Sequence, residues 1–180
     1  MKIIGFCGLP GSGKSSALNA INKIGYIVNM GDVIRDEAKK RGLNPIDSDL
    51  GKIAQDLREK KGLGIIARKC IEKINHLDNE IIFIDGLRSM EEVLIFREIW
   101  KLPIVAITID EERRFNRIKE RARKDDPESY EELKVRDKRE TNFGVRKVIK
   151  NADYTVTNNS SPSELKEQTI KLIRKIIEDY

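Results

Sequence analysis

Gly8-Leu9-Pro10-Gly11-Ser12-Gly13-Lys14-Ser15 is the stretch that decides the fold of this chain. Two glycines separated by four residues and followed by Lys and Ser form the phosphate-binding loop pattern. The apolar run 2–7 before it predicts a buried strand, and residues 16–24 after it predict a helix. A strand, a glycine loop and a helix N-terminus together make an anion site, because backbone N–H groups point into the loop and the helix dipole adds positive charge. The alternative, a chance glycine-rich turn, gives no reason for the flanking strand and helix.

The residue types in this loop indicate what it binds. Gly11 and Gly13 carry no Cβ, so the backbone can approach a phosphate closely. Lys14 can reach the β- and γ-phosphates of a nucleotide, and the Ser15 hydroxyl can ligate Mg²⁺. We therefore expect ATP and Mg²⁺ as cofactors, with the nucleotide held by Gly8, Leu9, Pro10, Gly11, Ser12, Gly13, Lys14, Ser15 and Ser16.

The composition favours an enzyme of one domain that works in the cytoplasm. The 180 residues suffice for a substantial core. No apolar run approaches the roughly 20 residues that span a membrane, and no signal peptide is expected because the first strand leads directly into the loop. The two cysteines, Cys7 and Cys70, suggest no disulfide framework, which fits a reducing compartment.

Charged residues are abundant and of mixed sign, with 35 Lys and Arg against 30 Asp and Glu and a net charge of +5. Such a composition, rich in Ile and Lys, suits a thermophile, whose proteins carry networks of surface ion pairs. The positive balance suits anionic ligands, of which nucleotides are one class and nucleic acid another.

Apolar runs alternate with helical segments along the chain, which is typical of a parallel α/β sheet. Five short strands are expected, at residues 2–7, 26–29, 81–85, 104–109 and 154–157. Their Ile- and Val-rich composition is that of strands buried on both faces. Ligands bind such doubly wound sheets at the C-terminal edge of the strands, so the functional site is expected there.

Two segments are longer than a single crossover needs and are interpreted as insertions over the active edge of the sheet. The first, 31–77, predicts helices at 32–41, 49–61 and 63–75. The second, 111–150, is mostly charged and predicts two helical arms joined by a turn at 124–128. We expect an acceptor-binding unit and a lid, respectively. The remainder of the single domain 1–180 forms its core, at 1–30, 78–110 and 151–180.

Three further blocks extend the pattern beyond the loop: Gly31-Asp32-Val33-Ile34-Arg35, Asp85-Gly86-Leu87-Arg88, and a run of arginines after the fourth strand. With these blocks the whole chain resembles the adenylate-kinase-related group of P-loop nucleotide kinases. Within that group it is most similar to an archaeal family related to adenylate kinase and to dephospho-coenzyme A kinase. The resemblance implies a P-loop NTPase fold of the nucleoside monophosphate kinase kind, with a helical acceptor-binding insertion and a lid.

The first block resembles a Gly-Asp-x-x-Arg segment of adenylate kinases, whose arginine holds the α-phosphate of the acceptor AMP. The resemblance implies that Arg35 binds the acceptor. A guanidinium one helical turn after Asp32 suits that role, because it grips phosphate through two parallel hydrogen bonds. Asp32 is also a candidate for the acceptor site, and alternatively a cap of the helix that follows.

The second block follows a buried apolar strand, so Asp85 is placed to hold the water shell of Mg²⁺ beside the phosphate loop. Gly86 lets a ligand pass close to the backbone, and Arg88 can grip the acceptor phosphate. Adenylate kinases have Asp-Gly-Phe-Pro-Arg at this place, whereas this chain is one residue shorter and lacks the Phe-Pro pair. The alternative role for Asp85 is a helix cap at the strand end.

Arginines crowd the expected lid. In this kinase class, arginines from both arms of the lid close over the phosphates, where negative charge spreads over the oxygens of the transferred group. Arg117 and Arg121 are four residues apart and share a helix face, and Arg136 lies in the second arm. These three are expected to act in catalysis. The others nearby are interpreted as solvated residues paired with glutamates: Arg113, Arg114 and Arg123.

The segment 157–161 resembles an Asn-bearing turn that lies near the donor adenine in dephospho-coenzyme A kinases and their relatives. Asn158 can hydrogen-bond an adenine edge, and Asn is also an ordinary turn residue. Asn158 therefore joins the expected nucleotide site, with a turn role as the alternative.

Three functions are compatible with these residues. The leading one is ATP-dependent phosphorylation of a nucleoside monophosphate, with AMP as the expected acceptor. Its phosphate oxygen is already ionised, so positioning, Mg²⁺ and arginines suffice. The second is phosphorylation of dephospho-coenzyme A, whose ribose hydroxyl calls for a general base such as Asp32. The third is a nucleotide-binding regulator or RNA-associated protein with little turnover, although the chain has few aromatic residues for base stacking.

Overall fold

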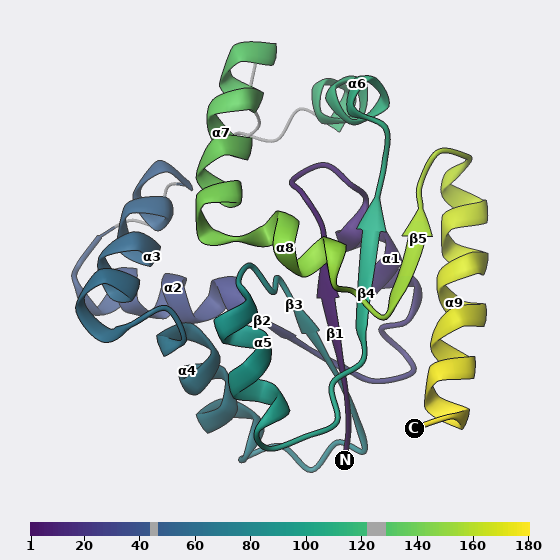
Figure 1. Cartoon of the computed structure of the whole chain (residues 1–180), viewed down its shortest axis with the longest axis horizontal. Coiled ribbons are helices and arrows are strands. Elements are labelled where there is room, and N and C mark those ends of the chain that lie inside the picture. The colour runs from purple at the N-terminus through teal and green to yellow at the C-terminus, as the bar shows by residue number, and fades with distance from the viewer. Residues whose placement is uncertain (44–46, 122–128) are drawn as a thin grey trace.

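A computed structural model describes residues 1–43, 47–121 and 129–180, with the side chains of 47–49 and 121 outside the description. The described part contains a five-stranded, all-parallel sheet in the order β2-β3-β1-β4-β5 (Figure 1). The strands are β1 (Lys2–Cys7), β2 (Tyr26–Asn29), β3 (Ile81–Asp85), β4 (Ile104–Thr108) and β5 (Tyr154–Thr157). Four of them have the predicted bounds, and β4 ends one residue earlier than expected.

Helices cover both faces of the sheet, which explains why the central strands are apolar throughout. Ile4 and Phe6 of β1 pack with Phe83 of β3 under α1 and α9, and the two rings meet edge to face at 5.9 Å. Ile3 and Cys7, on the opposite face, pack under α2, α4, α5 and α8. Within the described residues the helices are α1 (Lys14–Ala20), α2 (Met30–Lys40), α3 (Asp47–Lys61), α4 (Ile65–Ile74), α5 (Met90–Arg97), α6 (Glu111–Arg121), α7 (Tyr130–Phe143), α8 (Val145–Lys150) and α9 (Pro162–Glu178).

The start of α2 corrects one expectation. The residue that caps this helix is Asn29, whose side-chain oxygen accepts a hydrogen bond of 2.8 Å from the backbone N–H of Gly31. Asp32 therefore does not cap the helix but lies in its first turn, where a carboxylate still favours the positive end of the helix dipole. The capping side chain comes from the strand end itself, so the helix begins at Met30, two residues before the predicted start.

The region expected to form the lid contains two long helices, α6 and α7, that are anchored by apolar side chains. Ile118 of α6 and Leu133 of α7 are buried, and Phe115 meets Tyr130 edge to face at 5.5 Å. The expected turn at 124–128 lies outside the described residues. Both arms are thus packed through apolar side chains, although the segment is mostly charged.

Both ends of the chain lie at the amino edge of the sheet (Figure 1). The hydroxyl of the C-terminal residue, Tyr180, accepts a hydrogen bond of 3.0 Å from Ile3 N and donates one to the carbonyl of Lys101. The Lys101 ammonium returns a hydrogen bond of 3.0 Å to the Tyr180 carbonyl. No helix in the described part of the chain is long and apolar enough to cross a bilayer.

Candidate active site at the carboxyl edge of the sheet

The phosphate-binding loop has the backbone that its glycines predict. Gly11 and Gly13 adopt φ angles of +81° and +98°, in the region that side chains with a Cβ rarely adopt. A Cβ on Gly13 would lie 2.1 Å from Nδ2 of Asn158. The loop leads directly into α1, whose first residue is Lys14, so the free N–H groups of the helix face the loop.

Asn158 supports this loop from β5. Its Nδ2 donates a hydrogen bond of 2.8 Å to the carbonyl of Ser12, and its backbone N–H donates one of 2.7 Å to Thr108 O. The side chain lines the cavity described below but is buried, with 1% of its surface exposed. Two roles were expected for Asn158, binding an adenine edge or forming a turn; in the structure its amide nitrogen is committed to the loop backbone, which it braces.

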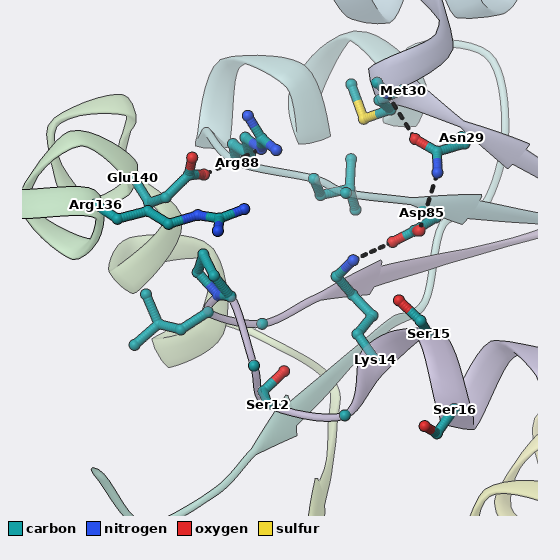
Figure 2. A pocket seen from close by; sticks show the side chains of 18 of the residues that line it. Ser12, Lys14, Ser15, Ser16, Asn29, Met30, Asp85, Arg88, Arg136 and Glu140 are labelled. Carbon is teal, nitrogen blue, oxygen red and sulfur yellow. Dashed lines mark hydrogen bonds and ion pairs between the residues drawn. The ribbon is translucent and has the colours of Figure 1, made fainter. Parts of the chain in front are cut away.

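Lys14, at the start of α1, and Asp85, at the end of β3, form an ion pair (Figure 2). The second carboxylate oxygen of Asp85 accepts a hydrogen bond of 3.4 Å from Nδ2 of Asn29. Asn29 thus both caps α2 and contacts the acid. Since Lys14 is the expected partner of the nucleotide phosphates, a phosphate that enters the loop competes with Asp85 for the ammonium.

The loop forms the floor of a cavity of about 570 Å³ that is rich in arginine. Gly86 and Arg88 line it from the end of β3, Leu50 and Ile66 from the insertion, and Glu140 from α7. Ser15 and Ser16 line it at the start of α1. The arginines among its described lining residues are Arg35, Arg58, Arg88, Arg117, Arg136 and Arg139. Such a density of cations suits a ligand that carries several negative charges.

The predicted acceptor residues fall into two groups. Gly86, with φ of +103°, and Arg88 both line the cavity, and Nε of Arg88 lies 3.1 Å from Oε2 of Glu140. Arg35 also lines it, but its guanidinium pairs with Asp32 on the same helix, and both side chains are about half exposed. Asp32 itself is not among the described residues that line the cavity.

The predicted catalytic arginines are partly brought together. Arg117 and Arg136 line the cavity from α6 and α7, and Nη2 of Arg117 also donates a hydrogen bond of 2.9 Å to the carbonyl of Ser160. The side chain of Arg121 and the whole of Arg123 lie outside the described residues. Arg113 is exposed, as expected, and donates to the carbonyl of Asn159.

Arg114 contradicts the expectation of a solvated residue. It is 3% exposed, and its two terminal nitrogens bind the two carboxylate oxygens of Asp137 on α7, with Nη1 at 2.8 Å from Oδ1. The same Nη1 donates a hydrogen bond of 3.2 Å to the carbonyl of Pro10 in the phosphate-binding loop. Arg114 therefore ties both arms of the lid to the loop. The expectation failed because a helical pattern shows which residues share a face but not which of them a second helix will cover.

Four charged cavity residues were not singled out as site residues from the sequence: Arg58, Glu120, Arg139 and Glu140. Arg139 and Glu140 follow Arg136 at helical spacings of three and four, so the same reasoning that paired Arg117 with Arg121 could have found them. A Cβ on Gly51 of α3 would lie 2.7 Å from Nη1 of Arg139, so α7 touches the insertion here. Arg58, on α3, belongs to no sequence motif that would have marked it as a site residue.

The site fits ATP and Mg²⁺. The positive-φ loop leaves room for phosphate oxygens, and the Ser15 hydroxyl and Asp85 carboxylate are the hard oxygen ligands that Mg²⁺ prefers. Within the described residues, no three His, Cys, Asp or Glu side chains gather as a metal cluster. The further ligands of such an ion would be phosphate oxygens and water.

The fold and this loop define the class of the protein, a P-loop kinase-like domain. A family model described as an AAA domain matches residues 7–134. Two solved structures share the fold: a Thermus thermophilus protein with a TM-score of 0.63, over 97% of this chain and 96% of that one, and the shikimate kinase of Aquifex aeolicus with 0.56, over 96% of each chain. Both are 19% identical to this chain.

Closer relatives narrow the assignment. A UPF0200 protein of Methanothermobacter thermautotrophicus is 38% identical over 99% of this chain and 92% of the relative. A UPF0200/UPF0201 protein of Archaeoglobus fulgidus is 42% identical over 98% of this chain, which spans 56% of the length of that relative. The chain belongs to the UPF0200 family of archaeal proteins, which confirms the archaeal P-loop kinase-like family expected from the sequence.

Proposed function

We propose that this protein transfers the γ-phosphoryl group of ATP to a nucleoside monophosphate, with AMP as the expected acceptor. One observation carries the proposal: arginines surround the cavity beside the phosphate-binding loop, whereas Asp32 is not among its described lining residues. A hydroxyl acceptor needs a general base, and Asp32 was the acid that the sequence offered for that role. A phosphate acceptor needs only cations and alignment.

In the proposed reaction, each group of site residues has a distinct role. The loop backbone and Lys14 would hold the β- and γ-phosphates of ATP, and Ser15 and Asp85 would hold Mg²⁺, which would supply charge neutralisation. Arg88 and Arg35 bind the acceptor phosphate. Three lid arginines stabilise the transferred group: Arg117, Arg121 and Arg136.

The reaction balances without a proton transfer. An ionised oxygen of the acceptor phosphate forms a bond to the γ-phosphorus, while the bond from that phosphorus to the β–γ bridging oxygen breaks. The bridging oxygen keeps the electron pair and leaves as the terminal oxygen of ADP. With AMP as acceptor, the two products are both ADP. The cavity then has two tasks, to align the oxygens in line and to exclude water.

An acceptor panel tests the proposal. Purified protein is given ATP and Mg²⁺ with each nucleoside monophosphate, with dephospho-coenzyme A or with RNA, and product formation is followed by chromatography. AMP should be phosphorylated, and Asp32→Asn should lower kcat by no more than about ten-fold. Transfer to dephospho-coenzyme A alone, with a loss on the order of 10²–10⁴ in Asp32→Asn, would replace the proposal with hydroxyl phosphorylation.

A further inference from the structure

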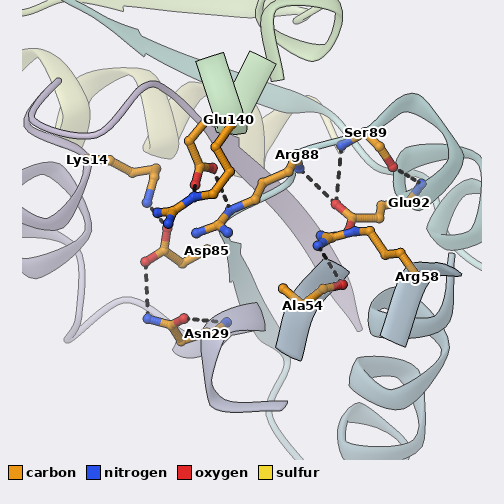
Figure 3. Close-up of polar contacts among 11 residues, drawn as sticks. Lys14, Asn29, Ala54, Arg58, Asp85, Arg88, Ser89, Glu92 and Glu140 are labelled. Carbon is orange, nitrogen blue, oxygen red and sulfur yellow. Dashed lines mark hydrogen bonds and ion pairs between the residues drawn. The ribbon is translucent and has the colours of Figure 1, made fainter. Parts of the chain in front are cut away.

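A buried ion pair outside every sequence motif joins the insertion to α5. Nη2 of Arg58, on α3, lies 2.8 Å from Oε1 of Glu92, on α5 (Figure 3). The two side chains are 3% and 0% exposed. Removing two charges from water is costly, so a pair this deeply buried calls for a reason beyond stability.

Glu92 holds the segment that presents Arg88. Its second oxygen, Oε2, accepts hydrogen bonds from the backbone N–H of Arg88 at 2.8 Å and of Ser89 at 3.3 Å. In return, the Ser89 hydroxyl accepts a hydrogen bond of 3.2 Å from the N–H of Glu92, which completes a capping box. One carboxylate therefore fixes the backbone of Arg88 with one oxygen and Arg58 with the other.

Arg58 extends this link to two further elements. Its Nη1 donates a hydrogen bond of 3.3 Å to the carbonyl of Ala54, one turn earlier in α3, and its guanidinium lies 4.4 Å from the ring centre of Phe143 at the end of α7. Arg58 also lines the cavity. The planar, forked guanidinium can meet a carboxylate, a carbonyl and a ring at once, which a lysine ammonium cannot.

Arg88 is held at its side chain as well. Figure 3 shows its side chain running from the strand end toward Asp85 and Lys14, and its Nε lies 3.1 Å from Oε2 of Glu140 on α7. Both the backbone and the guanidinium of Arg88 are thus fixed by buried carboxylates, and one of these, Glu92, is paired with Arg58 of the insertion.

We propose that Arg58 and Glu92 are positioning residues that couple the insertion and α7 to the acceptor-binding guanidinium of Arg88. Neither residue needs to touch the acceptor. Their pair sets where the Arg88 backbone lies, and a small displacement there moves the guanidinium away from the acceptor phosphate. This inference rests on the proposed function, in which Arg88 binds that phosphate.

A double-mutant cycle tests the coupling. Titration calorimetry measures the affinity for AMP and for a non-hydrolysable ATP analogue. The proteins compared are wild type, Arg58→Gln, Arg88→Ala and the double variant. Arg58→Gln should weaken the binding of AMP about ten-fold and the binding of the ATP analogue less than two-fold. In the Arg88→Ala background, Arg58→Gln should cost nothing further, because the residue it acts through is gone. Independent, additive losses would refute a positioning role and leave a merely structural one.

A matched control separates position from charge. Arg41 lies in the same insertion and bridges α2 and α3 on the surface, at 3.0 Å from Glu37 and 2.7 Å from Asp56. Arg41→Gln removes the same charge and should leave AMP affinity within two-fold. If Arg41→Gln weakens AMP binding as much as Arg58→Gln does, the overall positive charge of the insertion is responsible, and the inference fails.

A measurement without acceptor keeps this inference distinct from the proposed function. Hydrogen exchange of the backbone amides of Arg88 and Ser89 should be faster in Arg58→Lys. This milder variant keeps the positive charge but loses the forked guanidinium group. Unchanged exchange would overturn the coupling whatever the acceptor is. If wild type binds no AMP while these amides do quicken, the proposed acceptor is wrong and the coupling stands.

Discussion

The buried pair of Arg114 and Asp137 offers a quantitative test of how the lid is fixed. Replacing Arg114 by Met removes two contacts with the Asp137 carboxylate and one with the Pro10 carbonyl, and it leaves Asp137, 8% exposed, without its cation. Removing one partner of a buried pair costs about 3–5 kcal/mol. In a chain of 180 residues this lowers the melting temperature by roughly 6–20 °C.

The double variant Arg114→Met, Asp137→Leu should recover most of that loss, to within about 1 kcal/mol of wild type, because no orphaned charge remains. Its affinity for a non-hydrolysable ATP analogue should stay roughly ten-fold below wild type, since the charge-assisted bond to Pro10 is still missing. Stability and nucleotide affinity would thus separate.

Urea unfolding followed by circular dichroism, together with calorimetric titration, measures both quantities. Arg113→Met is the matched control, because Arg113 is the adjacent residue and its side chain is 58% exposed; it should change the free energy of unfolding by less than about 0.5 kcal/mol. A cost below about 1 kcal/mol for Arg114→Met would refute the reasoning. So would a double variant as unstable as the single one, because the orphaned carboxylate could not then be the cause.

Other changes test the loop and the thiols. Lys14→Ala should lower turnover about 100-fold or more in a coupled kinase assay with the fold intact, and a loss under ten-fold would contradict its role. Gly13→Ala should lower the melting temperature, since its φ of +98° costs roughly 1–2 kcal/mol with a Cβ that would also displace Asn158; unchanged melting would contradict this. Burial raises the pKa of Cys7 and of Cys70 to about 12, so both thiols stay protonated at pH 8 and should react with Ellman's reagent only after unfolding.

Local patterns predicted the fold and the floor of the site well. The bounds of β1 and β3 follow from short, mainly apolar runs, of which β1 is followed by Gly8 and β3 ends at Asp85. The apolar run and the residue that ends it are local signals, within a few residues of each other. The loop was predictable for the same reason, because its glycines and Lys14 all lie within residues 8–14. Asp85 was expected beside the phosphate-binding loop, and it pairs there with Lys14, since parallel strands bring their carboxyl ends to one edge.

Long-range pairs account for what the sequence did not reveal. Arg114 pairs with Asp137, which lies 23 residues away in the sequence, and Arg58 pairs with Glu92, which lies 34 residues away. About a third of the residues in this chain are charged. Many opposite charges could pair, and only the tertiary fold, which brings these residues of α6 and α7 and of α3 and α5 together, selects these pairs. The capping role weighed for Asp32 as an alternative is wrong for a different reason: Asn29, three residues earlier, lies at the strand end and caps the same helix.

The hydrogen bonds that hold Tyr180 have a practical consequence for experiments on this molecule. Its hydroxyl joins the C-terminus to Ile3 and Lys101 at the amino edge of the sheet, while the cavity opens at the carboxyl edge. An affinity tag or a sensor-chip linker attached after Tyr180 therefore begins on the side away from the nucleotide. Protein immobilised through this end presents its cavity to the flowing solution, so surface-based binding measurements can be made without blocking the site under study.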